Sequence, residues 1–196
     1  MDKVAIITGG GRGLGRAFAK ALAAEGAKVV IAEIDGGSAA RVAAEIKDSG
    51  GQAYAIETDV RDEGSVNSMV AKTVSKFGGT DILINNAALL GTLTKGPFEE
   101  LEVHEFEEAL KVNVTGAFIV TKAVVNHMRA AKWGRIINMS SDTAHVGVTG
   151  FLHYVSSKAA LVGFTRALAR EVGPDGITVN AIQPGLTETE VERGPG

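Results

Sequence analysis

Val4-Ala-Ile-Ile-Thr8 followed by Gly9-Gly-Gly-Arg-Gly-Leu-Gly15 is the stretch of sequence that decides the fold. A short run of mostly aliphatic residues followed by closely spaced glycines is typical of a buried strand that turns sharply into a helix. Glycine lets the backbone come close to a phosphate, and the first N–H groups of the next helix are free to bind it. The stretch therefore predicts a strand, a phosphate-binding turn and a helix that begins near Gly13.

The same alternation continues along the chain. The predicted strands are 4–8, 29–32, 53–56, 82–84, 135–139 and 177–182. The predicted helices are 13–25, 38–47, 63–77, 104–128 and 153–172, the fourth with an interruption near Asn113. Continuously apolar strands joined by helices are typical of a parallel sheet that is covered on both faces. With right-handed crossovers, the pattern predicts a doubly wound α/β fold (a Rossmann fold) with strand order 3-2-1-4-5-6.

Composition limits the classes of function. The 196 residues are 45% hydrophobic and 22% charged, which predicts one globular domain over 1–196. A net charge of -3 gives no sign of a nucleic-acid or membrane partner, and the lack of cysteine excludes thiolate metal sites and disulfides. The N-terminal apolar run is too short for a signal peptide or a membrane span. We therefore expect a cytoplasmic protein.

Glu33 and Arg12 bear on the choice of dinucleotide. Glu33 closes the second predicted strand, about 20 residues beyond the glycine-rich turn, where a carboxylate can bind the ribose 2′-hydroxyl of NAD. A carboxylate there repels the 2′-phosphate of NADP, whereas a basic residue in the turn, such as Arg12, can bind it. We give the acid more weight, so the sequence predicts NAD and leaves NADP as the less favoured alternative.

Tyr154 and Lys158 form the centre of the predicted chemistry. They lie four residues apart in a predicted helix, so their side chains share one face. A neighbouring ammonium group favours the phenolate form of tyrosine, and a positively charged nicotinamide ring would favour it further. Tyr154 can then act as general base in alcohol oxidation and as general acid in carbonyl reduction. Ser141 follows the fifth strand, at the carboxyl ends where open α/β sheets bind ligands.

Asparagines add further polar groups near the carboxyl ends of the strands, the edge of the sheet that we call the rim. Asn85-Asn86-Ala87 ends the fourth predicted strand, although an Asx-turn would also explain these residues. Asn113 lies inside a helical pattern, and asparagine disfavours helix interiors. A residue that breaks a local rule in this way suggests a functional role.

With these motifs, the sequence resembles the short-chain dehydrogenase/reductase family in its single-domain form. The resemblance spans essentially the whole chain and rests on Thr8-Gly9-xxx-Gly13-x-Gly15, Asp59-Val60, Asn85-Asn86-Ala87, Asn113, Ser141, Tyr154-xxx-Lys158 and Pro184-Gly185. It implies an oxidoreductase that transfers a hydride between NAD(H) and a secondary alcohol or ketone.

The resemblance also implies a role for each matching residue. Tyr154 is expected to be the acid/base, Ser141 to hold the substrate oxygen and Lys158 to bind the nicotinamide ribose. Asn113 is expected to hold a water that links Lys158 to solvent, whereas Ser140 is expected to be structural. The expected cofactor-binding residues are Gly9, Arg12, Gly13, Leu14, Gly15, Glu33, Asp59, Val60, Asn86, Ala87, Tyr154, Lys158, Pro184, Gly185, Thr187 and Thr189, with Ile182 supporting the nicotinamide.

The remaining candidates concern the substrate pocket. No pair of histidines has the spacing of a helical metal site, so no metal is predicted. His104 and His127 are expected on the surface and Trp133 in packing, whereas His145 and His153 are candidate pocket residues. An apolar wall that would suit a hydrophobic or aromatic substrate is expected from Leu89, Leu90, Val146 and Phe151.

The C-terminal part of the fold is expected to be incomplete. The family runs to about 250 residues by resemblance, so a C-terminal lid and a seventh strand are expected to be missing, which leaves the sixth strand as an exposed edge.

Two rival hypotheses about the function stay open: an NADPH-dependent 3-oxoacyl-type reductase, and a non-catalytic dinucleotide-binding sensor or scaffold. The expected partners are a small-molecule substrate and further copies of the chain, in a dimer or homotetramer that uses the helices around Asn113 and Tyr154.

Overall fold

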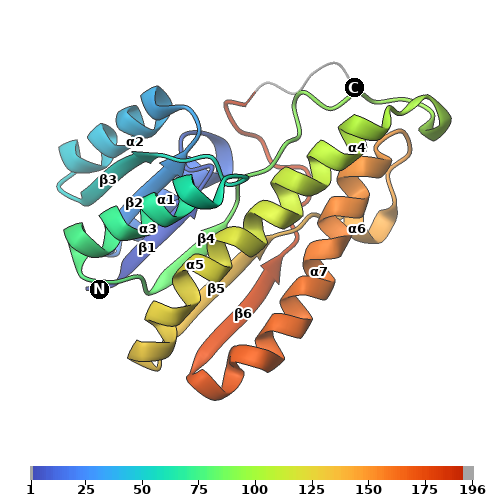
Figure 1. The fold of residues 1–196 in the computed structure, drawn as a ribbon. Helices are drawn as coiled ribbons and strands as arrows, with labels where there is room; N and C mark the ends of the chain where they lie inside the picture. Colours follow the sequence, from blue (N-terminus) through green and yellow to red (C-terminus); the bar gives the residue numbers. More distant parts are fainter. Residues whose placement is uncertain (1, 192–196) are drawn as a thin grey trace.

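A six-stranded parallel sheet forms the middle layer of the protein, as Figure 1 shows for the computed structural model, which describes residues 2–191. Its strands are β1 (Val4–Thr8), β2 (Lys28–Glu33), β3 (Gln52–Glu57), β4 (Ile82–Asn85), β5 (Gly134–Met139) and β6 (Ile177–Ile182). Their order in the sheet is β3-β2-β1-β4-β5-β6, and all neighbouring pairs are parallel. The predicted doubly wound fold and its strand order are therefore confirmed.

The α-helices are α1 (Gly13–Ala24), α2 (Gly36–Asp48), α3 (Glu63–Phe77), α4 (Val103–Leu110), α5 (Gly116–Ala131), α6 (Thr143–Val146) and α7 (Leu152–Val172). Short 3₁₀ turns, η1 (Phe98–Glu100) and η3 (Gly173–Asp175), lie before α4 and after α7. Helix α2 begins earlier than predicted because the Asp35 side chain accepts a hydrogen bond from the Gly37 N–H and caps it. Helix α6 was not predicted, since four residues are too few to show a helical period.

The predicted interruption near Asn113 is a π-helical turn, η2 (Lys111–Thr115), between α4 and α5. The two helices continue through it as one long rod in Figure 1. A π turn inserts an extra residue into the helical ladder, and such turns are frequent at functional sites. The local conflict that asparagine created in the sequence therefore corresponds to a real irregularity of the backbone.

Two apolar clusters hold the helices to opposite faces of the sheet. One contains Ile6, Leu83 and Ile136 with residues of α3, α5 and α7. The other contains Ile7 and Ile31 with residues of α1 and α2. Burial of both faces explains why the strands read as continuous apolar runs rather than alternating ones.

Trp133 packs against the second cluster, as expected. Lys3 Nζ lies 3.8 Å from the centre of its ring, and the Arg135 guanidinium lies 4.4 Å from it. Such cation–π contacts fix the ring at the amino end of β5, away from the carboxyl ends of the strands.

Strand β6 is an edge of the sheet within the described residues, as predicted. Ile177 and Val179 are buried, whereas Thr178, Asn180 and Ile182 on the opposite face are exposed. Among residues 2–191, no helix combines the length and the hydropathy that a membrane span requires.

Candidate active site

The glycine-rich turn after β1 brings two backbone segments closer together than any side chain would allow. A Cβ atom on Gly15 would lie 2.1 Å from the Gly9 carbonyl oxygen, and one on Gly9 would lie 2.9 Å from Ala87 Cα. Gly9 also has a φ of +62°, in the left-handed region that favours glycine. We call this site the cradle. It is formed by the backbone of the turn, Gly9 to Gly15, and by the segment after β4 at Asn86 and Ala87.

The open end of α1 lies in this cradle and suits an anion. Arg12 is the N-cap residue of α1, but its side chain makes no capping hydrogen bond. The Gly13 N–H donates instead to the carboxylate of Glu190, at 3.1 Å. A carboxylate at this position takes the place that a phosphate would occupy at a helix N-terminus. The turn therefore fits the pyrophosphate of a dinucleotide.

Thr8 and Asn86 lock the turn to the end of β4. Thr8 Oγ1 accepts hydrogen bonds from the backbone N–H groups of Asn86 and Ala87, at 3.0 and 3.1 Å. The Asn86 amide donates to the carbonyl oxygens of Thr8 and Gly9, both at 3.0 Å. Asn86 therefore shapes the cradle from inside. Thr8 belongs to the motif that carries the family resemblance, although no role was predicted for its hydroxyl.

Glu33 faces the same turn. Its Oε2 accepts a hydrogen bond from the Gly11 N–H at 3.1 Å, and its Oε1 accepts one from the Ile34 N–H at 2.9 Å. The carboxylate is thus held beside the cradle, where the adenosine ribose of a dinucleotide is expected. The Arg12 side chain, in the same turn, is exposed.

Asp59 and Val60 follow β3. The Asp59 carboxylate binds the Arg61 guanidinium at 2.8 Å, and Arg61 also reaches Glu108 at 3.3 Å. The hydrogen bonds from Arg61 lower the pKa of Asp59, so this side chain already has a strong partner before any adenine binds. Val60 is buried against Gly116, where a Cβ would lie 2.8 Å from its Cγ2. This contact holds the segment close to the π turn.

Lys158 is a buried cation at the end of β5. Its side chain is 3% exposed, and Nζ donates to the Met139 carbonyl oxygen at 2.6 Å. Burial lowers the pKa of Lys158 to about 8. Nζ lies 5.6 Å from the centre of the Tyr154 ring. The predicted pair is therefore together in space, and the ammonium group lies on a face of the tyrosine.

Asn113 connects the π turn to the same helix. Its Oδ1 accepts from the Leu89 N–H at 2.7 Å, and its Nδ2 donates to Ser157 Oγ at 2.9 Å. Ser157 Oγ in turn donates to the Tyr154 carbonyl oxygen at 2.7 Å. The side-chain amide is thus engaged by protein groups, which leaves the backbone of Asn113 as the part that could hold a water. Ser157 was not singled out from the sequence, because a serine inside a helix gives no distinct signal.

The two serines after β5 differ in their surroundings. Ser140 Oγ donates to the Lys158 carbonyl oxygen at 2.7 Å, which is a structural contact of the kind expected. Within the described residues, Ser141 Oγ makes two longer contacts, as an acceptor from the Thr143 N–H and as a donor to Asp142 Oδ1, both at 3.3 Å. Such long hydrogen bonds leave this hydroxyl free to turn toward a substrate oxygen.

Phe151 lies between Tyr154 and His153. Its ring stacks on Tyr154 with centroids 4.9 Å apart and meets His153 edge to face at 5.3 Å. Leu89 packs on the same small cluster. Of the other candidate wall residues, Leu90 is 37% and Val146 70% exposed. His145, which contacts Gln183, is exposed, as are His104 and His127.

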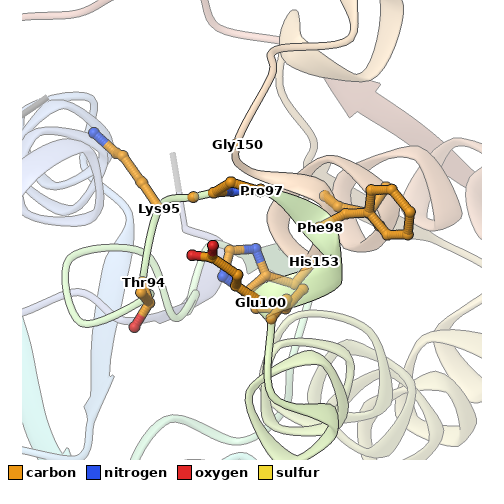
Figure 2. A pocket seen from close by; sticks show the side chains of 10 residues that line it. Thr94, Lys95, Pro97, Phe98, Glu100, Gly150 and His153 are labelled. Carbon is orange, nitrogen blue, oxygen red and sulfur yellow. The ribbon is translucent and has the colours of Figure 1, made fainter.

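A cavity of about 90 Å³ opens beside His153, between the segment before α4 and the start of α7 (Figure 2). It is lined by Thr94, Lys95, Gly96, Pro97, Phe98, Glu100, Leu101, Gly150, Leu152 and His153. His153 is fully buried, and its Nδ1 accepts a hydrogen bond from the Tyr154 N–H at 2.9 Å. A neutral ring must then carry its proton on Nε2, which has no hydrogen-bond partner among the described residues.

The segment after β6 crosses the rim toward the cradle. The Pro184 carbonyl oxygen accepts from the Asp142 N–H at 3.1 Å, which ties it to the segment that follows Ser141. Thr187 Oγ1 donates to the Gly185 carbonyl oxygen, also at 3.1 Å. Thr189 lies near Gly13, where a Cβ would be 3.8 Å from its Oγ1. Of the predicted C-terminal cofactor residues, Thr189 thus reaches the glycine-rich turn, whereas Pro184 contacts the segment that follows Ser141.

A buried amide network supports the rim from below. Asn85 Nδ2 donates to Asn138 Oδ1 at 2.8 Å and to Thr121 Oγ1 at 3.0 Å, while Asn138 Nδ2 donates to Thr165 Oγ1 at 2.9 Å. These bonds join β4, β5, α5 and α7. No period in the sequence marks this network, because its members are isolated polar residues inside apolar elements. Within the described chain, no group of three or more His, Asp or Glu side chains could hold a metal ion.

Comparison with known proteins adds independent evidence. The short chain dehydrogenase family model matches residues 3–194. The chain is 40% identical over 190 residues to a 3-oxoacyl-(acyl-carrier-protein) reductase of Aquifex aeolicus (strain VF5), which covers 96% of this chain and 75% of that protein. It is 41% identical over 190 residues to galactitol 2-dehydrogenase of Agrobacterium fabrum (strain C58 / ATCC 33970), covering 96% and 72%.

Two solved structures are also similar. An NAD⁺-bound xylitol dehydrogenase superposes with a TM-score of 0.90 at 34% identity, covering 94% of this chain and 70% of that one. A 3-ketoacyl-(acyl-carrier-protein) reductase from Brucella melitensis, complexed with NADH, gives a TM-score of 0.90 at 38% identity, covering 96% and 77%. The cradle, the Tyr154–Lys158 pair and these matches all indicate the same family. The chain belongs to the short-chain dehydrogenase/reductase family, and it is an oxidoreductase that uses a nicotinamide dinucleotide and acts on an alcohol or carbonyl group.

Proposed function

We propose that the protein transfers a hydride between NAD(H) and a secondary alcohol or ketone, with Tyr154 as the general acid/base. The observation that carries this proposal is the contact between Lys158 and Tyr154, whose helix is fixed from the π turn by Asn113 and Ser157. Structural packing alone gives little reason to bury a lysine, because burial penalises its charge.

The residues divide the work as follows. In oxidation, Tyr154 takes the proton of the substrate hydroxyl, and in reduction it returns that proton to the carbonyl oxygen. Ser141 holds this oxygen by a hydrogen bond. Lys158 places a positive charge beside the tyrosine ring and binds the nicotinamide ribose, and the Asn113 backbone holds a water toward solvent. The bound cofactor supplies or accepts the hydride.

The position of Glu33 supports NAD as the cofactor. Its carboxylate is fixed beside the turn by the Gly11 N–H, so a 2′-phosphate brought to this place would meet a negative charge. Titration with NADH and NADPH, followed by fluorescence of the reduced cofactor, tests this. Glu33→Gln should reduce the preference for NADH by about tenfold. Glu57→Gln, the matched change on the adjacent strand, should not alter the preference.

The NADPH-dependent 3-oxoacyl-type reductase remains the second candidate. It is favoured by the exposed Arg12 in the turn and by the similarity to 3-oxoacyl-(acyl-carrier-protein) reductases. Tighter binding of NADPH than of NADH to the unmodified protein would show that Arg12 outweighs Glu33. The Arg12→Ala variant should then lose that preference.

On the substrate side, an apolar wall lies near a donor, His153 Nε2–H, that has no partner in the described part of the chain. Phe151 and Leu89 supply the wall, and this supports a hydrophobic or aromatic group next to the reacting carbon. His153 Nε2–H, buried beside the adjoining cavity, would donate to an oxygen on a more distant part of the substrate. A panel of secondary alcohols with and without such an oxygen, followed by absorbance of reduced cofactor, would identify the class.

The Tyr154→Phe variant separates an enzyme from a non-catalytic sensor. It should keep its affinity for NADH and lose turnover by about 10²- to 10⁴-fold, because only the proton-transferring hydroxyl is removed. Turnover equal to that of the unmodified protein on an accepted substrate would remove Tyr154 from the mechanism. A protein that binds NADH but turns over no alcohol or ketone would support the sensor hypothesis.

We also propose that 1–196 is one dinucleotide-binding and catalytic domain, that the protein is cytoplasmic and that it forms a homotetramer. The outer face of α7 carries the exposed small residues Ala160, Gly163 and Ala167, and Phe118 on α5 is 49% exposed. Small residues let a second helix approach closely. Gly163→Arg has open space within the monomer, so it should reduce the mass in light scattering without lowering stability. An unchanged mass would exclude this face.

A further inference from the structure

Glu190 binds the cradle from the far end of the described chain. Its Oε1 accepts the hydrogen bond from the Gly13 N–H at 3.1 Å and lies 3.7 Å from Arg16 Nη1. Both partners belong to the first turn of α1, where the helix dipole attracts negative charge. Hydrogen bonds from its own backbone N–H and from that of Gly13 lower the pKa of Glu190, so the carboxylate is ionised at neutral pH.

The residues around Glu190 fill the space in front of the turn. A Cβ atom on Gly13 would lie 3.1 Å from Val191 Cγ2 and 3.8 Å from Thr189 Oγ1. The tail therefore leaves little room for a side chain at Gly13 and lies directly in front of the turn. A pyrophosphate carries the same sign of charge as Glu190 and binds the same N–H group. The two anions cannot occupy this position together.

The contact between Glu190 and the glycine-rich turn is weak enough to be reversible. The Glu190 side chain is 52% exposed, so solvent screens its attraction to the turn. Arg16 has a stronger partner in Glu45, to which its Nε and Nη2 donate at 3.0 and 2.7 Å. When Glu190 leaves, Arg16 thus stays held in place, and the turn keeps its shape. Only the tail has to move.

We propose that Glu190 is an internal ligand of the dinucleotide turn, which the pyrophosphate of the cofactor displaces on binding. The carboxylate satisfies the first free N–H of α1 in the free protein and lowers the apparent affinity for the cofactor. The proposal rests on the proposed cofactor position at this turn. It does not depend on the substrate or on turnover.

The test compares Glu190→Ala with Glu188→Ala. Glu188 is an exposed acid two residues away, so its removal changes the net charge of the tail equally. Binding of ADP, which carries a pyrophosphate but no nicotinamide, is measured by calorimetry, and binding of NADH by fluorescence. Glu190→Ala should bind both about two- to fivefold more tightly, the range expected for one charge at a helix N-terminus. Glu188→Ala should stay close to the unmodified protein.

A second readout follows the tail itself. The sequence contains no cysteine, so a Val191→Cys variant can be labelled at one position with a fluorophore that reports its surroundings. Saturating ADP should shift the emission toward that of a water-exposed label, whereas nicotinamide alone should not.

Unchanged or weaker ADP binding by Glu190→Ala would overturn the proposal, and so would a label that ignores ADP. The lack of ADP binding in both the unmodified protein and Glu190→Ala would also overturn it, because a released turn should bind the nucleotide. Tighter ADP binding by a protein without any dehydrogenase activity would uphold this proposal and refute the proposed function.

Discussion

Replacing Lys158 by Met should stabilise the free protein at neutral pH while abolishing its activity. Lys158 is 3% exposed, and burial lowers its pKa from 10.5 to about 8. At 1.36 kcal/mol for each pKa unit, the charged ammonium group lowers the free energy of unfolding by about 3 kcal/mol at pH 7. Methionine is of similar length and carries no charge, but it leaves the Met139 carbonyl oxygen without its donor, which costs about 1 kcal/mol. The net gain at pH 7 should therefore be about 2 kcal/mol.

The gain should also depend on pH in a defined direction. The folded-state pKa of Lys158 lies below the unfolded value, so the unfolded chain binds more protons between pH 8 and pH 10.5. The free energy of unfolding of the unmodified protein should rise through this window relative to that of Lys158→Met. The advantage of the variant should thus disappear by about pH 10. Other titrating groups are common to both proteins, so their contributions cancel in the difference.

Urea unfolding of the cofactor-free proteins, followed by circular dichroism at pH 7 and pH 10, measures both effects. Lys122→Met is the matched control, because the Lys122 side chain is 60% exposed and its substitution removes no buried charge. A Lys158→Met protein that is less stable than the unmodified one at pH 7, by a margin independent of pH, would refute the reasoning. The Met139 contact would then outweigh the cost of burying the charge.

Two further substitutions test the cradle and the network below it. Gly15→Ala places a Cβ 2.1 Å from a backbone oxygen, so cofactor affinity should fall more than about tenfold in a fluorescence titration. Gly79→Ala, which meets nothing within 4 Å, should bind normally, and equal affinities would disprove the close approach. Asn85→Ala leaves Asn138 Oδ1 without its donor inside the protein and should lower the free energy of unfolding by about 1–3 kcal/mol in urea. A loss below about 0.5 kcal/mol would mean that water replaces the amide.

The sequence alone determined the architecture, because the relevant signals are local. Apolar runs and intervening amphipathic stretches predicted all six strands and their order, since right-handed crossovers leave few alternatives. Helical spacing predicted that Tyr154 and Lys158 share one face, and the surrounding motifs marked the pair as a site. The irregular Asn113 predicted an interruption of the helix, which is the π turn. Each of these inferences depends on residues that are close together in the chain or on a rule that holds for all chains.

Tertiary structure alone decided which distant groups meet. Ser157 links Asn113 to the Tyr154 carbonyl oxygen because α7 packs beside the π turn. Among residues 2–191, His153 Nε2 is buried and has no hydrogen-bond partner, and the Glu190 carboxylate accepts from the Gly13 N–H. A side chain's hydrogen-bond partners and its exposure to water are set by elements far away in sequence, and no local pattern records them. The fall in the pKa of Lys158 belongs to this second group, because a lysine in a sequence carries no sign of its burial.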